Sequence, residues 1–161
     1  MQRVVLVLFA VVAMAAISGA DPARLVTIAS ASDDSGETDP AVRKHNADTV
    51  RQALEPAVAA IDAEARRLDL EPRQLDVSIV RLDLTADDTK VYISSELRVV
   101  ISDAQGQMLT MLASSATIEV PVQSYRPSRL LRLRDQALEN ASAGLADSLR
   151  SRLLRARTPN A

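Results

Sequence analysis

The chain has 161 residues, with 19 Lys and Arg against 21 Asp and Glu, one histidine and no cysteine. A net charge of −2 argues against a general polyanion-binding protein, and an aromatic content of 2% removes the stacking surfaces that sugars and single-stranded nucleic acids use. We therefore expect no nucleic-acid partner. The lack of cysteine also excludes disulfides, thiol chemistry and thiolate metal ligands.

Residues 1–20 have the layout of a secretory signal peptide. Arg3 supplies a positive start, residues 4–17 form an unbroken apolar run, and Ser18 and Ala20 are the small residues that a signal peptidase accepts. The run is shorter than the about 20 apolar residues that span a bilayer. We therefore predict cleavage after Ala20 and an exported protein, periplasmic or extracellular. A lipoprotein carries a cysteine after its cleavage site, so the sequence also predicts that the chain is not a lipoprotein.

The mature chain is predicted to begin with a flexible polar segment, residues 21–39, in which LVTI at residues 25–28 is the one stretch suited to an edge strand. A helix is expected over residues 40–70, because Asp39 can cap it and Pro40 suits its first position. Pro56 lacks an N–H and is expected either to kink this helix or to split it. Its buried stripe is predicted to comprise Val50, Leu54, Ala57, Ile61, Ala65 and Leu68.

The spacing of apolar residues then changes to every second position. This pattern predicts strands over residues 75–84, 91–101 and 107–120, with a bulge near Val80 where the alternation changes parity. A tight turn is expected at residues 103–106. The inner face of the last strand is predicted to comprise Met108, Leu112, Ala116, Ile118 and Val120.

A second helix is expected from Pro127 to about Ala156, with leucine and alanine on its buried side. We interpret Gly144, which costs a helix about 1 kcal/mol relative to alanine, as a position where the helix lies close against the sheet. The predicted fold class is therefore α+β, a single two-layer domain over residues 40–157. It comprises a three-stranded antiparallel meander, with the optional fourth edge strand, and two long helices on one face. Residues 158–161 are predicted to fray.

Motifs that would indicate catalysis are missing from the sequence. His45 stands alone beside Arg43 and Lys44 in the first turns of a helix, so we interpret it as an exposed surface residue. The acidic pairs at residues 33–34 and 87–88 lack the spacing of a calcium loop and are interpreted as solvated turns. We predict no catalytic residue, no cofactor and no metal site.

These observations favour an exported, non-catalytic binding or assembly module of the bacterial cell envelope with a protein partner. The partner is expected to contact an open sheet edge or the arginine-rich last helix, since residues 122–161 hold eight arginines and three acids. One alternative is a hydrolase with dispersed Asp, Glu and Ser residues. Another is a structural protein tethered to a membrane by an uncleaved residue 1–20 segment, the one case in which membrane contact is expected. The candidate partner-binding residues are Arg132, Arg134, Arg150, Arg152 and Arg155.

Overall fold

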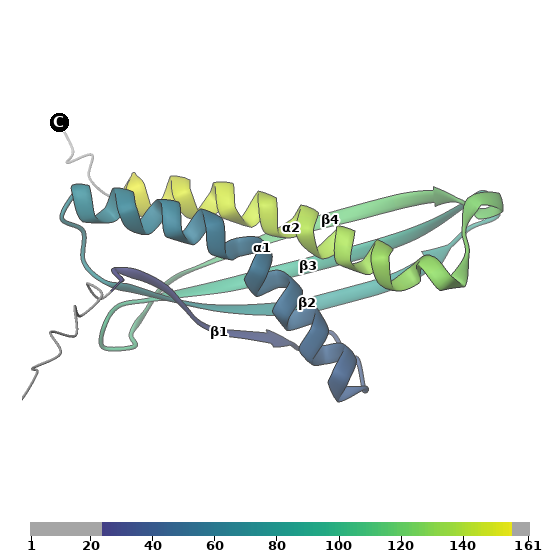
Figure 1. The fold of residues 1–161 in the computed structure, drawn as a ribbon, viewed down its shortest axis with the longest axis horizontal. Coiled ribbons are helices and arrows are strands. Elements are labelled where there is room, and N and C mark those ends of the chain that lie inside the picture. Colours follow the sequence, from purple (N-terminus) through teal and green to yellow (C-terminus); the bar gives the residue numbers. More distant parts are fainter. Residues whose placement is uncertain (1–23, 156–161) are drawn as a thin grey trace, which may run out of the picture.

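The computed structural model describes residues 24–155, so the predictions for residues 1–20 and 158–161 lie outside the described residues. Two long helices and four strands make up the fold, and two short 3₁₀ turns lie between the last strand and the last helix (Figure 1). In chain order the elements are β1 (Val26–Asp33), α1 (Pro40–Arg67), β2 (Arg73–Ala86), β3 (Lys90–Ser102), β4 (Met108–Pro121), η1 (Val122–Ser124), η2 (Pro127–Arg129) and α2 (Leu130–Leu154).

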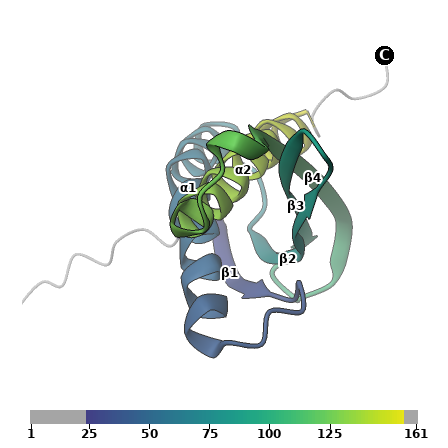
Figure 2. The same ribbon diagram turned by 90° about the vertical axis from the view of Figure 1, so that its right-hand side faces the viewer.

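The four strands form one sheet in the order β1-β2-β3-β4. β1 runs parallel to β2, whereas β2, β3 and β4 form an antiparallel meander. Both helices lie on the same side of this sheet, which leaves the other side uncovered (Figure 2). The predicted two-layer α+β fold is therefore confirmed, with a mixed sheet of four strands.

β1 extends further than the sequence predicted. It covers Val26–Asp33 instead of residues 25–28, and both Val26 and Asp33 are buried. Residues 26–33 are therefore part of the folded body and not a flexible lead-in. The chain reaches β2 by way of α1, which returns it to the same end of the sheet and makes the pairing parallel.

α1 is a single helix that passes through Pro56, so the split into two helices is wrong. Figure 1 shows the helix changing direction partway along, as expected where a proline removes one backbone hydrogen bond. Asp39 caps its start, accepting from the N–H of Ala41 at 2.8 Å. The predicted stripe is largely buried, except that Ala57 is half-buried, with Val58 in the buried position, and that Leu68 is half-buried at the C-cap just beyond the helix.

The meander follows the predicted alternation. The register of β2 and β3 shifts between Ile79 and Arg81, which confirms the bulge. Gly106 has φ +79° in the turn before β4, where the left-handed region favours glycine. The prediction that Met108 faces the core is wrong. Met108 is 63% exposed, because the register of β3 and β4 shifts at this end of the hairpin.

The core lies between the sheet and the two helices. α2 contributes Leu138, Leu145 and Leu149, which face β2 and β3 residues such as Leu75 and Leu97, and all five are fully buried. Among residues 24–155, neither helix carries the apolar stretch that crossing a bilayer requires.

Candidate functional site

The five arginines proposed as a partner-binding face do not form one patch. Arg132 and Arg150 lie about 27 Å apart along the axis of α2. Arg134 is half-buried and contacts Glu37 at 3.4 Å, while Arg150 contacts Glu64 of α1 at 3.2 Å. Arg134 therefore joins α2 to the loop before α1, and Arg150 joins α2 to α1.

His45 lies on the surface of α1 and contacts Asp135 of α2, with 2.9 Å between Nε2 and Oδ1. This contact joins the two helices. Within residues 24–155 no group of three or more His, Asp or Glu side chains is arranged to hold a metal ion.

The acidic pair at residues 33–34 differs from its predicted role as a solvated turn. Asp33 is buried and accepts hydrogen bonds from the side chain of Asn46 at 2.7 Å and from the backbone and hydroxyl of Ser35. The buried carboxylate ties the end of β1 to α1. The sequence could not show this, since the partner lies on another element.

Asp87 has the predicted turn role. Its carboxylate accepts from the backbone N–H groups of Thr89 and Lys90, each at 2.7 Å, and from the hydroxyl of Tyr92 at 2.9 Å. These hydrogen bonds, led by the N–H of Thr89, hold the pKa of Asp87 well below its usual range. Asp87 thus shapes the β2–β3 turn.

β4, with 14 residues, is the longer of the two edge strands of the sheet. β4 pairs with β3 alone, and none of its residues is fully buried. From Met108 to Ile118 it has no charged residue and no proline. Met111 is 53% exposed and Leu109 48% exposed on this strand. Natural edge strands usually carry charges, prolines or bulges that block pairing, and this stretch lacks the first two.

The opposite edge, β1, is protected. Both edge strands carry a register shift, at Ile28 to Ser30 in β1 and at Met108 to Thr110 in β4, so the difference lies in what covers them. Side chains of α1 take up backbone groups of β1: Arg51 donates to the carbonyl of Ile28 at 3.2 Å, and Asp62 accepts from the N–H of Val26 at 3.0 Å. The two edges of the sheet are therefore not equivalent, and β4 is the one left open.

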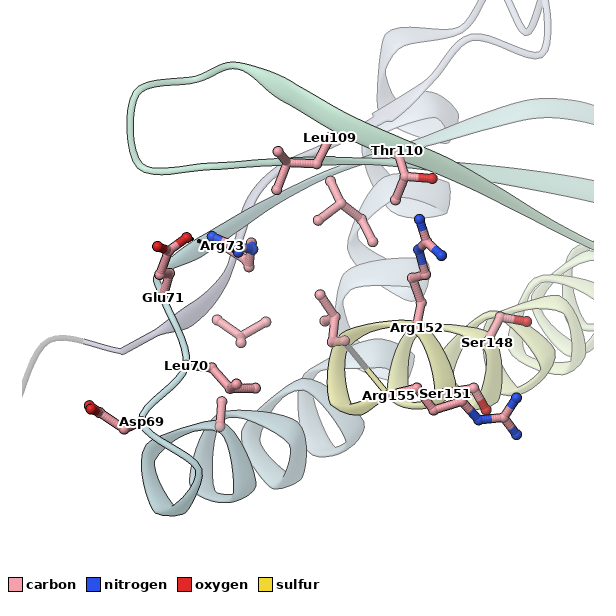
Figure 3. A pocket seen from close by; sticks show the side chains of 14 residues that line it. Asp69, Leu70, Glu71, Arg73, Leu109, Thr110, Ser148, Ser151, Arg152 and Arg155 are labelled. Atoms are coloured by element: carbon pink, nitrogen blue, oxygen red, sulfur yellow. Dashed lines mark hydrogen bonds and ion pairs between the residues drawn. The ribbon is translucent and has the colours of Figure 1, made fainter. Parts of the chain in front are cut away.

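A cavity of about 870 Å³ opens at the end of the molecule where both helices finish (Figure 3). It adjoins the start of β4 through Leu109 and Thr110. The sequence did not indicate this cavity, because its lining comes from six separate segments. The only sequence signal was the arginine pair Arg152 and Arg155, both of which line it.

No family model matches the sequence, and no curated protein matches it. Its fold resembles several solved structures. A hypothetical protein from Chlamydia trachomatis, CT253, has a TM-score of 0.52 at 11% identity, covering 82% of this chain and 98% of that one. A minor lipoprotein from Acinetobacter baumannii has a TM-score of 0.48 at 12% identity, covering 65% and 85%. Lipoprotein GNA1162 from Neisseria meningitidis has a TM-score of 0.39 at 12% identity, covering 74% and 97%.

The likeness to CT253 shows a shared fold. The localisation predicted from the sequence was an exported protein that is not a lipoprotein. Two of the structures that resemble this chain are themselves described as lipoproteins, so the prediction that set the protein apart from lipoproteins is contradicted. The prediction rested on the absence of cysteine after Ala20 and elsewhere in the chain, whereas the likeness rests on the folded domain.

Proposed function

We propose that this protein is a non-catalytic binding module of the bacterial cell envelope that pairs the open edge of β4 with an extended segment of a partner protein. The observation that carries the proposal is the uncharged, proline-free backbone from Met108 to Ile118 at the edge of a sheet. Strand addition uses the unpaired N–H and C=O groups of such an edge for affinity.

The side chains of β4 indicate what the partner strand looks like. Ala113, Ser115 and Thr117 are exposed on the uncovered side of the sheet, so they leave room for side chains of an added strand. Met108, Leu109 and Met111 place apolar surface at one end of the same edge. We expect a partner segment with small or polar residues opposite the centre of β4 and apolar residues opposite its start.

Photo-crosslinking in the native bacterium tests the proposal. A photoreactive amino acid at Ala113 is expected to crosslink to one specific protein, whereas the same group at Ala59, exposed on α1, is not. The double variant M111K/A113K adds two charges to the edge without touching the core. A tagged protein that carries both changes is expected to capture no partner.

Two controls distinguish the edge from the arginines of α2. A60K adds a charge on an exposed face of α1 and is expected to leave capture unchanged. Arg132 is exposed and lies far from β4's open start, so R132E is also expected to have no effect. Capture that survives M111K/A113K but is lost in R132E would assign the partner to α2 and overturn the proposal.

A further inference from the structure

The cavity at the ends of α1 and α2 has a floor of core residues. Apolar side chains from three strands, two helices and the loop between α1 and β2 border it, and most of them are buried. These residues are Val26, Ala65, Leu70, Ile101, Leu109 and Leu153. A volume of about 870 Å³ lies within the range of about 300–1,000 Å³ typical of pockets for small molecules. Apolar surface of this kind favours an apolar occupant over water.

The polar groups of the cavity are not spread evenly around it. Figure 3 shows Arg152 reaching from α2 toward β4, where Thr110 lies, with Ser148 and Ser151 on the same helix. The carboxylates of Asp69 and Glu71 are on the opposite side of the cavity. One wall therefore presents a guanidinium and hydroxyl groups next to an apolar floor.

Three arginines line the cavity: Arg152 and Arg155 come from α2, and Arg73 comes from the opposite wall. Arg73 is occupied, because it contacts the carboxylate of Glu71 at 3.1 Å and donates to the carbonyl of Pro72. Within residues 24–155, Arg152 makes no ion pair with an acidic side chain. Its five donors are thus available to an anion entering the cavity.

We propose that this cavity binds a fatty acid: its acyl chain lies on the apolar floor and its carboxylate is held by Arg152. The guanidinium suits a carboxylate because two parallel N–H donors match its two oxygens. Figure 3 shows Thr110 on β4 facing the Arg152 guanidinium, so its hydroxyl adds a neutral donor near the head group. This site shares Leu109 and Thr110 with the start of the open β4 edge, whereas its other lining residues lie on other segments, and its occupancy is measured in the absence of the partner proposed above.

A structural role for Arg152 gives a different expectation. It lies in the last turn of α2, where a cation interacts favourably with the negative end of the helix dipole. If that were its whole role, replacing it would lower the melting temperature and leave the preference among amphiphiles unchanged. A binding role changes the preference.

Displacement of the fluorescent fatty acid cis-parinaric acid from the purified chain measures that preference. Dodecanoate, dodecanol and dodecyltrimethylammonium share one chain length and differ in the charge of the head group. Dodecanoate is expected to compete best. R152Q is expected to weaken the binding of dodecanoate by about tenfold and to leave the binding of dodecanol unchanged, since only the charged hydrogen bonds are lost. R132Q, on the same helix but outside the cavity, is the matched control.

Ser151 is exposed on the cavity wall, so S151W fills the space without disturbing the core and is expected to abolish binding of dodecanoate and dodecanol alike. M111K/A113K is expected to bind dodecanoate like the wild type, which keeps this test independent of the β4 proposal. Equal binding of the three probes, no displacement at all, or identical results for R152Q and R132Q would each overturn the fatty-acid site. Self-association that S151W abolishes, without amphiphile binding, would assign the cavity to a second copy and also overturn it.

Discussion

Gly144 of α2 lies directly against Ser114 of β4: a Cβ atom on Gly144 would stand 2.6 Å from the hydroxyl oxygen of Ser114. This confirms the interpretation that the helix approaches the sheet closely at its one glycine. The contact sets how near α2 lies to the edge strand.

A double-mutant cycle tests this contact. Alanine favours a helix over glycine by about 1 kcal/mol, but in G144A the new methyl group meets the Ser114 hydroxyl and cancels that gain or exceeds it. In the S114A background the hydroxyl is absent, so G144A is expected to raise the free energy of unfolding by about 1 kcal/mol. Urea unfolding of the four proteins gives the coupling. Equal effects of G144A in both backgrounds would contradict the contact.

Asp62 holds the start of β1 onto α1. Its carboxylate accepts from the N–H groups of Leu25 at 2.6 Å and Val26 at 3.0 Å and from Arg66 at 2.9 Å. D62N removes the charge from these hydrogen bonds and is expected to lower the free energy of unfolding at pH 7 by about 1–3 kcal/mol. D48N, on an exposed turn of the same helix, is expected to change it by less than about 0.5 kcal/mol.

The same carboxyl makes this difference depend on pH. Burial opposes ionisation of Asp62, but the N–H groups of Val26 and Leu25 and the guanidinium of Arg66 outweigh it and hold the pKa below its usual 3.8. A lowered pKa in the folded state contributes stability above pH 3.8, and this contribution is lost as the pH falls through the folded-state value. The gap between wild type and D62N is therefore expected to narrow between pH 5 and pH 2. A gap that stays constant would contradict this linkage.

Two buried serines are expected to contribute differently to the free energy of unfolding. Ser95 of β3 donates to the carbonyl of Ala137 at 2.8 Å, whereas within the described residues the buried hydroxyl of Ser142 has no hydrogen-bond partner. S95A is expected to lower the free energy of unfolding by about 1 kcal/mol, and S142A to leave it unchanged or raise it by up to about 1 kcal/mol. Thermal melts of both variants measure these changes. Equal destabilisation by S95A and S142A would contradict the predicted difference.

Tyr92 reports on the β2–β3 turn. Its hydroxyl donates to Asp87 at 2.9 Å, and this hydrogen bond, more than burial, raises the pKa of Tyr92 above its usual 10.0. In a Y125F background Tyr92 is the sole tyrosine, so ultraviolet absorbance follows it alone. D87N is expected to shift its titration to lower pH. D88N alters the adjacent carboxylate and is expected to leave the titration unchanged, so equal shifts would contradict the assignment.

Local rules account for most of the elements. The change of apolar spacing at Glu71 and Pro72 predicted where helix gives way to strand, and the parity change near Val80 predicted the bulge seen between Ile79 and Arg81. These features follow from which side of one element is buried, which is visible within a dozen residues.

The candidate sites depend on contacts between elements distant in the sequence. Residues 29–33 carry no strand pattern of their own, and β1 extends over them because β2 supplies its hydrogen bonds and Asn46 holds Asp33. Only the tertiary structure separates the five arginines, placing Arg134 on Glu37 and Arg150 on Glu64.

The sequence by itself determined the two-layer α+β fold and the ends of most of its elements, because burial of one side of a helix or strand leaves a periodic record in the chain. The tertiary structure alone decided that β1 pairs in parallel, that β4 is the open edge and that six segments enclose a cavity beside Arg152. The physical reason is range: periodicity records whether a side chain is buried, but not which distant side chain or backbone group it meets.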